Sequence, residues 1–184
     1  MYGLVNRALE ELIRTTHGDD TWEKIKERAE VDVEVFVRMD AYPDDITYRL
    51  VGAASELLNQ SPDALLKAFG EYWTLYTGRE GYGDLLDAAG NTLQEALANL
   101  DDLHVRVGLM YPELKPPSFR CTDVTAEGLV LHYYSSRAGL APMVIGLIEG
   151  LGKRFGHTLE ITPLTLRDSG DDHDSFAIRI LQTA

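Results

Sequence analysis

The chain has 184 residues, of which 45% are hydrophobic, and its formal net charge is −13. This length and composition indicate about one folded domain with its own apolar core, and they exclude a disordered chain. The acidic balance argues against a nucleic-acid-binding protein, which needs a basic face for phosphate, and against docking on anionic lipid. The single cysteine, Cys121, excludes an internal disulfide and a zinc site built from several cysteines.

The apolar pattern gives no sign of a targeting or membrane segment. Residues 1–7 enter a helical pattern without the apolar run of a signal peptide. The most apolar stretch, residues 139–147, is too short to span a bilayer and is soon followed by Glu149. We therefore expect a cytoplasmic protein.

Helical periodicity dominates the first half of the chain. Residues 3–16 place apolar side chains on one face, and further helices are expected to begin after a cap at Asp20, at residues 44–45 and at Pro62. Alternating valines over residues 31–37 resemble a strand locally. We assign no strand there, because the stretch lies between helices and has no evident pairing partner.

The helix that begins at Pro62 is expected to end at Gly78 and has an unusually aromatic face. Phe69, Tyr72 and Trp73 contribute to this face. Such a face is consistent with plain core packing, and it also suits the wall of a site for a flat, apolar ligand. The helix alone leaves both interpretations open.

Residues 93–109 predict one long helix with a histidine in its apolar stripe. Thr92 and Glu95 have the spacing of a capping box at its start. Because successive helical residues turn by about 100°, five side chains share one face. These are Leu93, Leu97, Leu100, His104 and Val107. His104 therefore points inward, as a core histidine with a satisfied ring nitrogen or as a ligand for a metal.

The second half predicts strands around one helix. Residues 118–124 and 129–136 form a hairpin, a helix follows over 142–155, and residues 159–166 and 176–180 alternate as two more strands. Helices followed by hairpins indicate an α+β fold with a helical N-terminal lobe and a sheet-containing C-terminal lobe.

Three polar residues on the second strand form a candidate anion clamp. Tyr133, Ser135 and Arg137 alternate, so in an extended chain they project from one face. A phenol, a hydroxyl and a guanidinium suit carboxylates or phosphate, although a solvent-facing sheet surface has the same pattern. His104 and this clamp together match the needs of a haem. Its iron can bind an imidazole, and its two propionates accept hydrogen bonds from donors such as those of the clamp.

Several motifs, spread from end to end, make the chain recognisable. They are residues 1–6 (MYGLVN), 52–56 (GAASE), 69–73 (FGEYW), 103–108 (LHVRVG), 116–117 (PP), the Tyr133-x-Ser135-x-Arg137 triplet and residues 139–153. The chain resembles the haem–nitric oxide/oxygen binding family, the H-NOX domains, which are related to the haem domain of soluble guanylate cyclase. The likeness is strongest to members of cyanobacterial type.

The resemblance implies a fold and a set of roles. It implies one H-NOX domain over residues 1–184, with a helical lobe to about residue 112 and a lobe from about residue 113 with a four-stranded antiparallel sheet. Haem b would be held non-covalently between the lobes, since the lone cysteine excludes covalent attachment. His104 would be the proximal iron ligand, and Pro117 would pack against the porphyrin and distort it. Tyr133, Ser135 and Arg137 would bind the propionates.

The resemblance also bears on gas selectivity. Oxygen-binding members place a tyrosine on the helix after the clamp, whereas this chain has Met143 and no tyrosine there. By resemblance Met143 and Trp73 line the distal side of the haem, with Val5 and Leu147 as neighbours. Oxygen on ferrous iron gains negative charge and needs a hydrogen-bond donor more than NO or CO does. We expect a haem that binds NO and CO and binds oxygen poorly.

The function implied is a gas sensor that is not itself an enzyme. NO binding would weaken or break the bond between iron and His104, and a histidine kinase or a cyclic-dinucleotide enzyme would respond as partner. The alternatives are a haem carrier or storage protein, an oxygen-binding haem protein, a small haem enzyme, or an interaction module without haem. A peroxidase-like enzyme would show a distal His–Arg pair, which the sequence lacks.

Two other groups have simpler interpretations. The run Asp171-Asp172-His173-Asp174 resembles a metal cluster, but contiguous residues in a turn rarely converge on one ion, so a solvated acidic turn is favoured. Cys121, on an expected strand, is better explained as a small core residue than as a reactive thiol.

Overall fold

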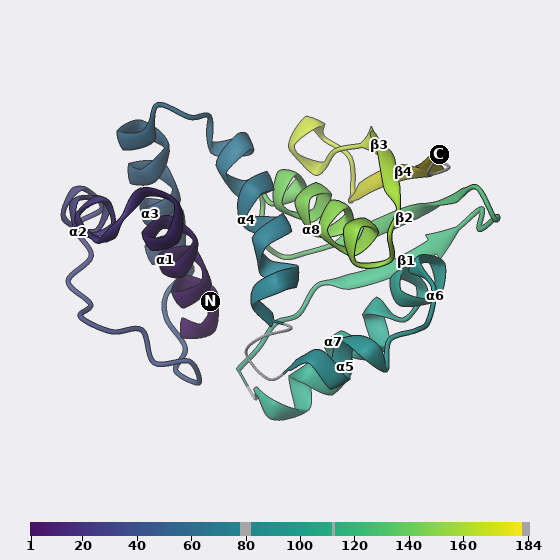
Figure 1. Cartoon of the computed structure of the whole chain (residues 1–184), viewed down its shortest axis with the longest axis horizontal. Helices are drawn as coiled ribbons and strands as arrows, with labels where there is room; N and C mark the ends of the chain where they lie inside the picture. The colour runs from purple at the N-terminus through teal and green to yellow at the C-terminus, as the bar shows by residue number, and fades with distance from the viewer. Residues whose placement is uncertain (78–81, 112, 182–184) are drawn as a thin grey trace.

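The computed structural model describes residues 1–77, 82–111 and 113–181. The helical half runs first and the sheet follows, with one long helix inserted between its strands (Figure 1). The elements are α1 (Gly3–His17), α2 (Asp19–Arg28), α3 (Asp44–Leu58), α4 (Pro62–Thr77), α5 (Gly83–Asp87), α6 (Leu93–Ala98), α7 (Leu100–Met110), β1 (Ser118–Thr122), β2 (Gly128–Tyr134), α8 (Ala141–Arg154), β3 (Thr158–Thr165), the short 3₁₀ helix η2 (Arg167–Ser169) and β4 (Asp174–Leu181).

The sheet is four-stranded and antiparallel, as predicted, with strand order β1-β2-β4-β3. Leu131 of β2 pairs with Cys121 on one side and with Phe176 on the other. Leu131 and Phe176 are fully buried. Because side chains alternate along a strand, this register turns one apolar face toward α8. The α+β fold class is therefore confirmed.

The core divides into two hydrophobic clusters. One joins the helices α1 to α4, with Trp22, Ile25 and Phe69 almost fully buried. The other joins the sheet to α8 and takes in Leu93 and Leu97 of α6. Residues from the helical part of the chain thus pack with the sheet.

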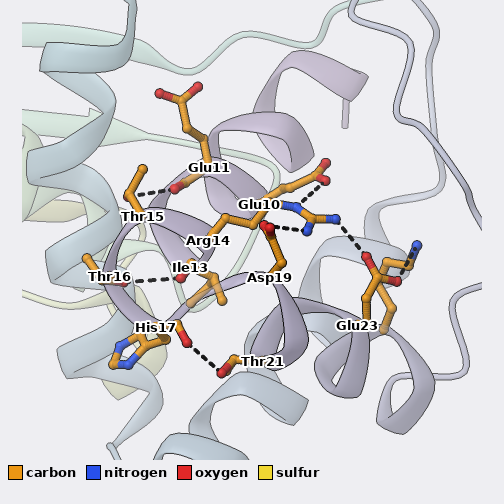
Figure 2. A network of polar contacts seen from close by, with 11 residues as sticks. Glu10, Glu11, Ile13, Arg14, Thr15, Thr16, His17, Asp19, Thr21 and Glu23 are labelled. Carbon is orange, nitrogen blue, oxygen red and sulfur yellow. Dashed lines mark hydrogen bonds and ion pairs between the residues drawn. The ribbon is translucent and has the colours of Figure 1, made fainter.

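A polar network fixes the junction of α1 and α2. The Arg14 guanidinium donates to Glu10 at 2.8 Å, to Asp19 at 2.8 Å and to Glu23 at 2.6 Å (Figure 2). Gly18, with φ of 86°, provides the turn between the helices. The expected cap at Asp20 was therefore wrong by two residues, because Gly18 is the N-cap and α2 begins at Asp19.

The other helix starts in the first half agree with the sequence. α3 begins at Asp44, and α4 begins at Pro62, where the Ser61 hydroxyl accepts from the Ala64 N–H at 3.2 Å. Residues 31–37 form no strand, in line with the doubt about their alternating pattern. The expected helix end at Gly78 and the residue-112 boundary lie outside the described residues.

The predicted helix over residues 93–109 was wrong in one respect, because it is broken. α6 ends at Ala98, and α7 begins at Leu100 after Asn99. The Asn99 amide donates to the Ala89 carbonyl oxygen at 2.7 Å. The break lies in the Asn99 backbone, with φ of −94° and ψ of 6°, although its N–H still donates to the Glu95 carbonyl oxygen at 3.0 Å.

The cap at the start of α6 was predicted correctly in part. The Glu95 N–H donates to the Thr92 hydroxyl at 3.2 Å, as in a capping box. The Glu95 carboxylate accepts from the N–H of Asn91 at 2.8 Å instead of reaching that of Thr92. The reciprocal bond is thus displaced by one residue.

α4 and α8 cross at backbone contact. A Cβ atom on Gly146 would lie 2.0 Å from the Lys67 carbonyl oxygen, and one on Gly70 would lie 2.0 Å from the Met143 carbonyl oxygen. Only glycine permits such an approach. No helix in the described part of the chain is long and apolar enough to cross a membrane.

Candidate functional site

A cavity of about 280 Å³ lies among the helices and the sheet. Side chains from α4 and α8 form one wall, and side chains from α7 and the start of β1 form the other. α1, α3 and β2 also contribute to the lining. Most of the lining is apolar, which suits a flat organic ligand with few polar groups.

The structure brings all nine candidate residues to this one cavity. They come from both halves of the sequence and from six separate segments. They are Val5, Trp73, His104, Pro117, Tyr133, Ser135, Arg137, Met143 and Leu147.

His104 presents an unprotonated nitrogen at the α7 wall. Its ring is partly buried, and Nδ1 lies 2.7 Å from the Leu100 carbonyl oxygen. A carbonyl only accepts, so Nδ1 carries the proton and donates it, which leaves a lone pair on Nε2. No hydrogen-bond partner for Nε2 occurs among the residues described. Burial lowers the pKa of His104, against smaller opposing effects of Leu100 and Asp101, which keeps the ring neutral.

The α7 part of the stripe that contains His104 faces the cavity, whereas Leu93 and Leu97 on α6 are buried in the core. Leu100, Leu103 and Val107 line the cavity beside it, and the described chain buries no residue of α7 fully. The Phe119 ring lies 5.1 Å from the His104 ring. Helical periodicity thus predicted the inward-facing histidine, whereas the cavity in front of it was implied only by the family resemblance.

The candidate clamp lies at the edge of the cavity. β2 ends at Tyr134, so Tyr133 is in the strand while Ser135 and Arg137 follow it. The Ser135 hydroxyl accepts from the Arg137 N–H at 3.1 Å, which bends the chain after the strand. Burial raises the pKa of Tyr133, so its phenol stays protonated and able to donate. All three side chains reach the same cavity although the extended strand stops before two of them.

Asp44 holds the guanidinium of this clamp and was missed by the sequence analysis. Arg137 Nε donates to Asp44 Oδ2 at 2.8 Å, and Arg137 Nη1 donates to the Lys115 carbonyl oxygen at 3.0 Å. The N-terminal ammonium of Met1 also contacts Asp44. Burial acts to raise the pKa of Asp44, but these two cations outweigh it and hold that pKa below its usual range. In the sequence Asp44 was only a helix start, because its partner is 93 residues away.

The opposite wall carries the aromatic residues of α4 and the first turns of α8. The Phe69 and Trp73 rings meet edge to face at 6.1 Å. Met143 and Leu147 add apolar surface from α8. The Thr74 hydroxyl is buried, and it has no hydrogen-bond partner among the described residues. Polar groups on this wall are therefore few.

These residues fit a haem on the chemistry of the donor set. One wall offers a neutral imidazole with a free nitrogen, as an iron atom requires. Apolar side chains on both walls suit the faces of the porphyrin. Tyr133, Ser135 and Arg137 at the edge offer donors for two carboxylates.

The acidic turn is held by bonds between its carboxylates and its own backbone. The described residues include no group of three or more His, Cys, Asp or Glu side chains placed to hold a metal ion. Two carboxylates instead bond to the turn: Asp171 accepts from the Leu166 N–H and Asp174 from the Arg167 N–H, both at 2.9 Å. Asp174 is buried, so the turn is less solvated than expected.

Cys121 behaves as the sequence suggested. It is partly buried and packs against the hydrophobic cluster of the sheet. Burial raises the pKa of its thiol, which disfavours the reactive thiolate.

Comparison with known proteins gives one family and many relatives. The model of the family described as "Haem-NO-binding" matches residues 2–163. Soluble guanylate cyclase gcy-35 of Caenorhabditis elegans is 33% identical over 162 residues, which are 86% of this chain and 23% of that protein. Soluble guanylate cyclase 89Db of Drosophila melanogaster is 26% identical over 171 residues, 93% of this chain and 25% of that protein. The chain thus spans about a quarter of the length of these relatives.

Solved structures show the same fold. An H-NOX protein from Shewanella oneidensis in the Fe(II)NO state superposes with a TM-score of 0.90 at 22% identity, covering 99% of this chain and 100% of that one. An unliganded Fe(II) H-NOX protein mutant from K. algicida gives a TM-score of 0.87 at 25% identity, covering 100% and 98%. The expected likeness to cyanobacterial members stays a prediction.

Proposed function

The chain belongs to the Haem-NO-binding family, and we propose that it senses NO through a haem b held in the cavity between α7 and α8. The observation that carries this proposal is the placement of His104. Its Nε2 lone pair lies at one wall of an apolar cavity whose edge carries the clamp residues Tyr133, Ser135 and Arg137.

Each residue has a defined task in the proposal. The haem supplies an iron atom that binds a diatomic gas. His104 binds that iron through Nε2, and the Leu100 carbonyl fixes the ring tautomer through Nδ1. Tyr133, Ser135 and Arg137 donate to the propionates, and Pro117 packs against the ring. Asp44 orients Arg137 for this task.

The distal side of the proposed site favours NO and CO over oxygen. Val5, Met143 and Leu147 offer no hydrogen-bond donor there, and α8 has no tyrosine in its first turn. Trp73 has an N–H, which leaves room for weak oxygen binding. We expect NO and CO complexes to form readily and an oxygen complex to be unstable in air.

The signal would pass through α7. If the bond between His104 Nε2 and the iron is lost, α7 is held only by its contacts with the rest of the chain. None of the α7 residues is fully buried among the residues that the structure describes. A helix with so few buried residues can change position at small energetic cost, which a two-state switch requires. We propose that the chain is not itself an enzyme and that a partner, such as a histidine kinase or a cyclic-dinucleotide enzyme, responds to this movement.

We also propose that residues 1–184 act as one domain. The helical part, to about residue 112, and the sheet-containing part both line the cavity. A ligand between them would join the two and transmit a change from one to the other.

An absorption spectrum tests the proposal. The reduced protein reconstituted with haem should show a Soret band that shifts with NO and with CO. His104→Gly should lose the proximal bond, and free imidazole should restore the spectrum of the unsubstituted protein. His17→Gly, at an exposed position at the end of α1, is the matched control.

Haem transfer distinguishes the sensor from a carrier. A sensor should release haem slowly to an acceptor protein such as apomyoglobin, and a carrier or storage protein should release it quickly. A chain that stays colourless after reconstitution would overturn the haem site altogether.

A further inference from the structure

The C-terminal end of α7 is fixed by a pair of tyrosines. Tyr111 follows the helix as its C-cap, and its side chain is only 3% exposed. Its hydroxyl is hydrogen-bonded to the hydroxyl of Tyr82, which precedes α5. Both side chains line the cavity. The pair therefore links the helix that carries His104 to a different part of the cavity wall.

Tyr111 also attaches this end of α7 to the start of α1. Its ring meets the Tyr2 ring edge to face, with centroids 4.7 Å apart. The Tyr2 hydroxyl accepts from the Glu113 N–H at 3.0 Å. Tyr2 is the N-cap of α1 and is itself buried. Tyr111, just after α7, is thus more deeply buried than any residue of the helix itself.

The rest of α7 is held by few contacts. Asn99 donates to the Ala89 carbonyl oxygen at its start, and Asp101 accepts from the Phe119 N–H at 2.9 Å. The outer side is open, with Val105 59% and Leu109 82% exposed. Movement of the helix is therefore governed by a small number of polar contacts.

The spacing along α7 places the Tyr82–Tyr111 pair on the same side of the helix as the His104 imidazole. Seven residues are close to two helical turns, so both residues face the same side, about 10 Å apart along the axis. Burial, followed by the bond to Tyr82, raises the pKa of Tyr111, so its phenol stays neutral. A contact that restrains Tyr111 thus also restrains the tilt of α7 and the position of His104.

We propose that the hydrogen bond between Tyr82 and Tyr111 is a tether that positions His104 and limits how far α7 swings from the cavity when the bond at Nε2 is lost. Tyr82 and Tyr111 are positioning residues, since they act through the helix. The proposal deepens the proposed function and rests on it. It adds that the ease of losing the His104 bond is set at the far end of the helix.

Hydrogen exchange on the haem-free chain gives the first test. Tyr82→Phe and Tyr111→Phe keep the rings and remove one hydroxyl each. The Tyr111 N–H, which donates to the Val107 carbonyl oxygen at 3.2 Å, should exchange about two- to tenfold faster in either variant. Amides of α8 should be unaffected. Tyr134→Phe, on a partly exposed ring outside the cavity, is the control and should leave both helices unchanged.

The second test follows NO displacement of His104 from the iron in the haem-loaded protein. Each single variant should raise the rate about two- to tenfold. The double variant should be no faster than either single variant, because both hydroxyls belong to one bond. Unchanged exchange and an unchanged displacement rate in both single variants would overturn the tether. An unsubstituted protein without a haem band would instead contradict the proposed function, and the exchange test does not depend on haem.

Discussion

The two walls of the cavity are built in opposite ways. On the α4–α8 side the helices meet at backbone contact, and α8 buries seven of its residues. On the α7 side, none of the eleven residues of the helix is fully buried among the residues that the structure describes. One wall is held by close packing and the other by separate hydrogen bonds.

This difference assigns different tasks to the walls. Close-packed interiors move little, since any shift creates voids or overlaps. If a gas binds beside Trp73 and Met143, as proposed, it would meet a pocket of fixed shape. The α7 wall would gain packing from a ligand in the cavity, so under the proposed function its position would respond to what the ligand does. Selectivity would thus reside in one wall and signalling in the other.

The largest effect should come from disturbing the close-packed wall. Gly146→Ala places a Cβ atom 2.0 Å from the Lys67 carbonyl oxygen, and neither backbone can yield without separating α4 from α8. We expect a loss of about 3 kcal/mol in the free energy of unfolding, measured with urea on the haem-free chain. Gly52→Ala in α3 is the control, because its Cβ would meet nothing within 4 Å among the described residues. Equal stability of the two variants would remove the contrast between the walls.

The sequence predicted the close-packed wall better than the open one. Prolines at the start and glycines at the end predicted α4 and α8, because these residues begin and end helices. They could not show that the two helices touch at Gly70 and Gly146, since the contact joins residues far apart in the chain. For residues 93–109 apolar periodicity predicted a core-facing stripe, of which Leu93 and Leu97 are buried in the core while the α7 part faces a cavity. Pattern alone does not distinguish the two, because apolar ligands and apolar cores select the same side chains.

The polar contacts of the site show the same limit. Tyr133, Ser135 and Arg137 were found from their alternation, although the strand ends before two of them. Asp44 was missed, because nothing local relates it to Arg137. Residue chemistry related His104 to the clamp, and family resemblance added Val5, Pro117, Met143 and Leu147 to the site.

A smaller effect should follow from loosening the start of α7. Asp101 accepts from the Phe119 N–H at 2.9 Å, and this bond, followed by the Ser118 hydroxyl, lowers the pKa of its carboxyl. Asp101→Asn should cost about 1 kcal/mol of stability at pH 7. Asp102→Asn, an exposed neighbour in the same helical turn, should cost less.

The pH dependence identifies the cause of that loss. A carboxyl whose pKa is lower in the folded chain contributes stability above its unfolded pKa, about 3.9, and loses it as the pH falls through the folded value. The stability difference between the unsubstituted chain and Asp101→Asn should therefore shrink below about pH 4. A difference that stays constant down to pH 2 would mean that charge on Asp101 does not hold α7 to β1.

The smallest effect should be a gain in stability, from a substitution in the α7 wall. Gly108 lies within α7, and a Cβ atom there meets nothing within 4 Å in the part of the chain that is described. Alanine in a helix interior is favoured over glycine by about 0.5–1 kcal/mol, so Gly108→Ala should stabilise α7 by up to that amount. Exchange of α7 amides should slow, and NO displacement of His104 should slow with it if a pliable helix carries the signal. A destabilised Gly108→Ala chain would mean that this wall is packed as tightly as the other, and the division of tasks between the walls would then fail.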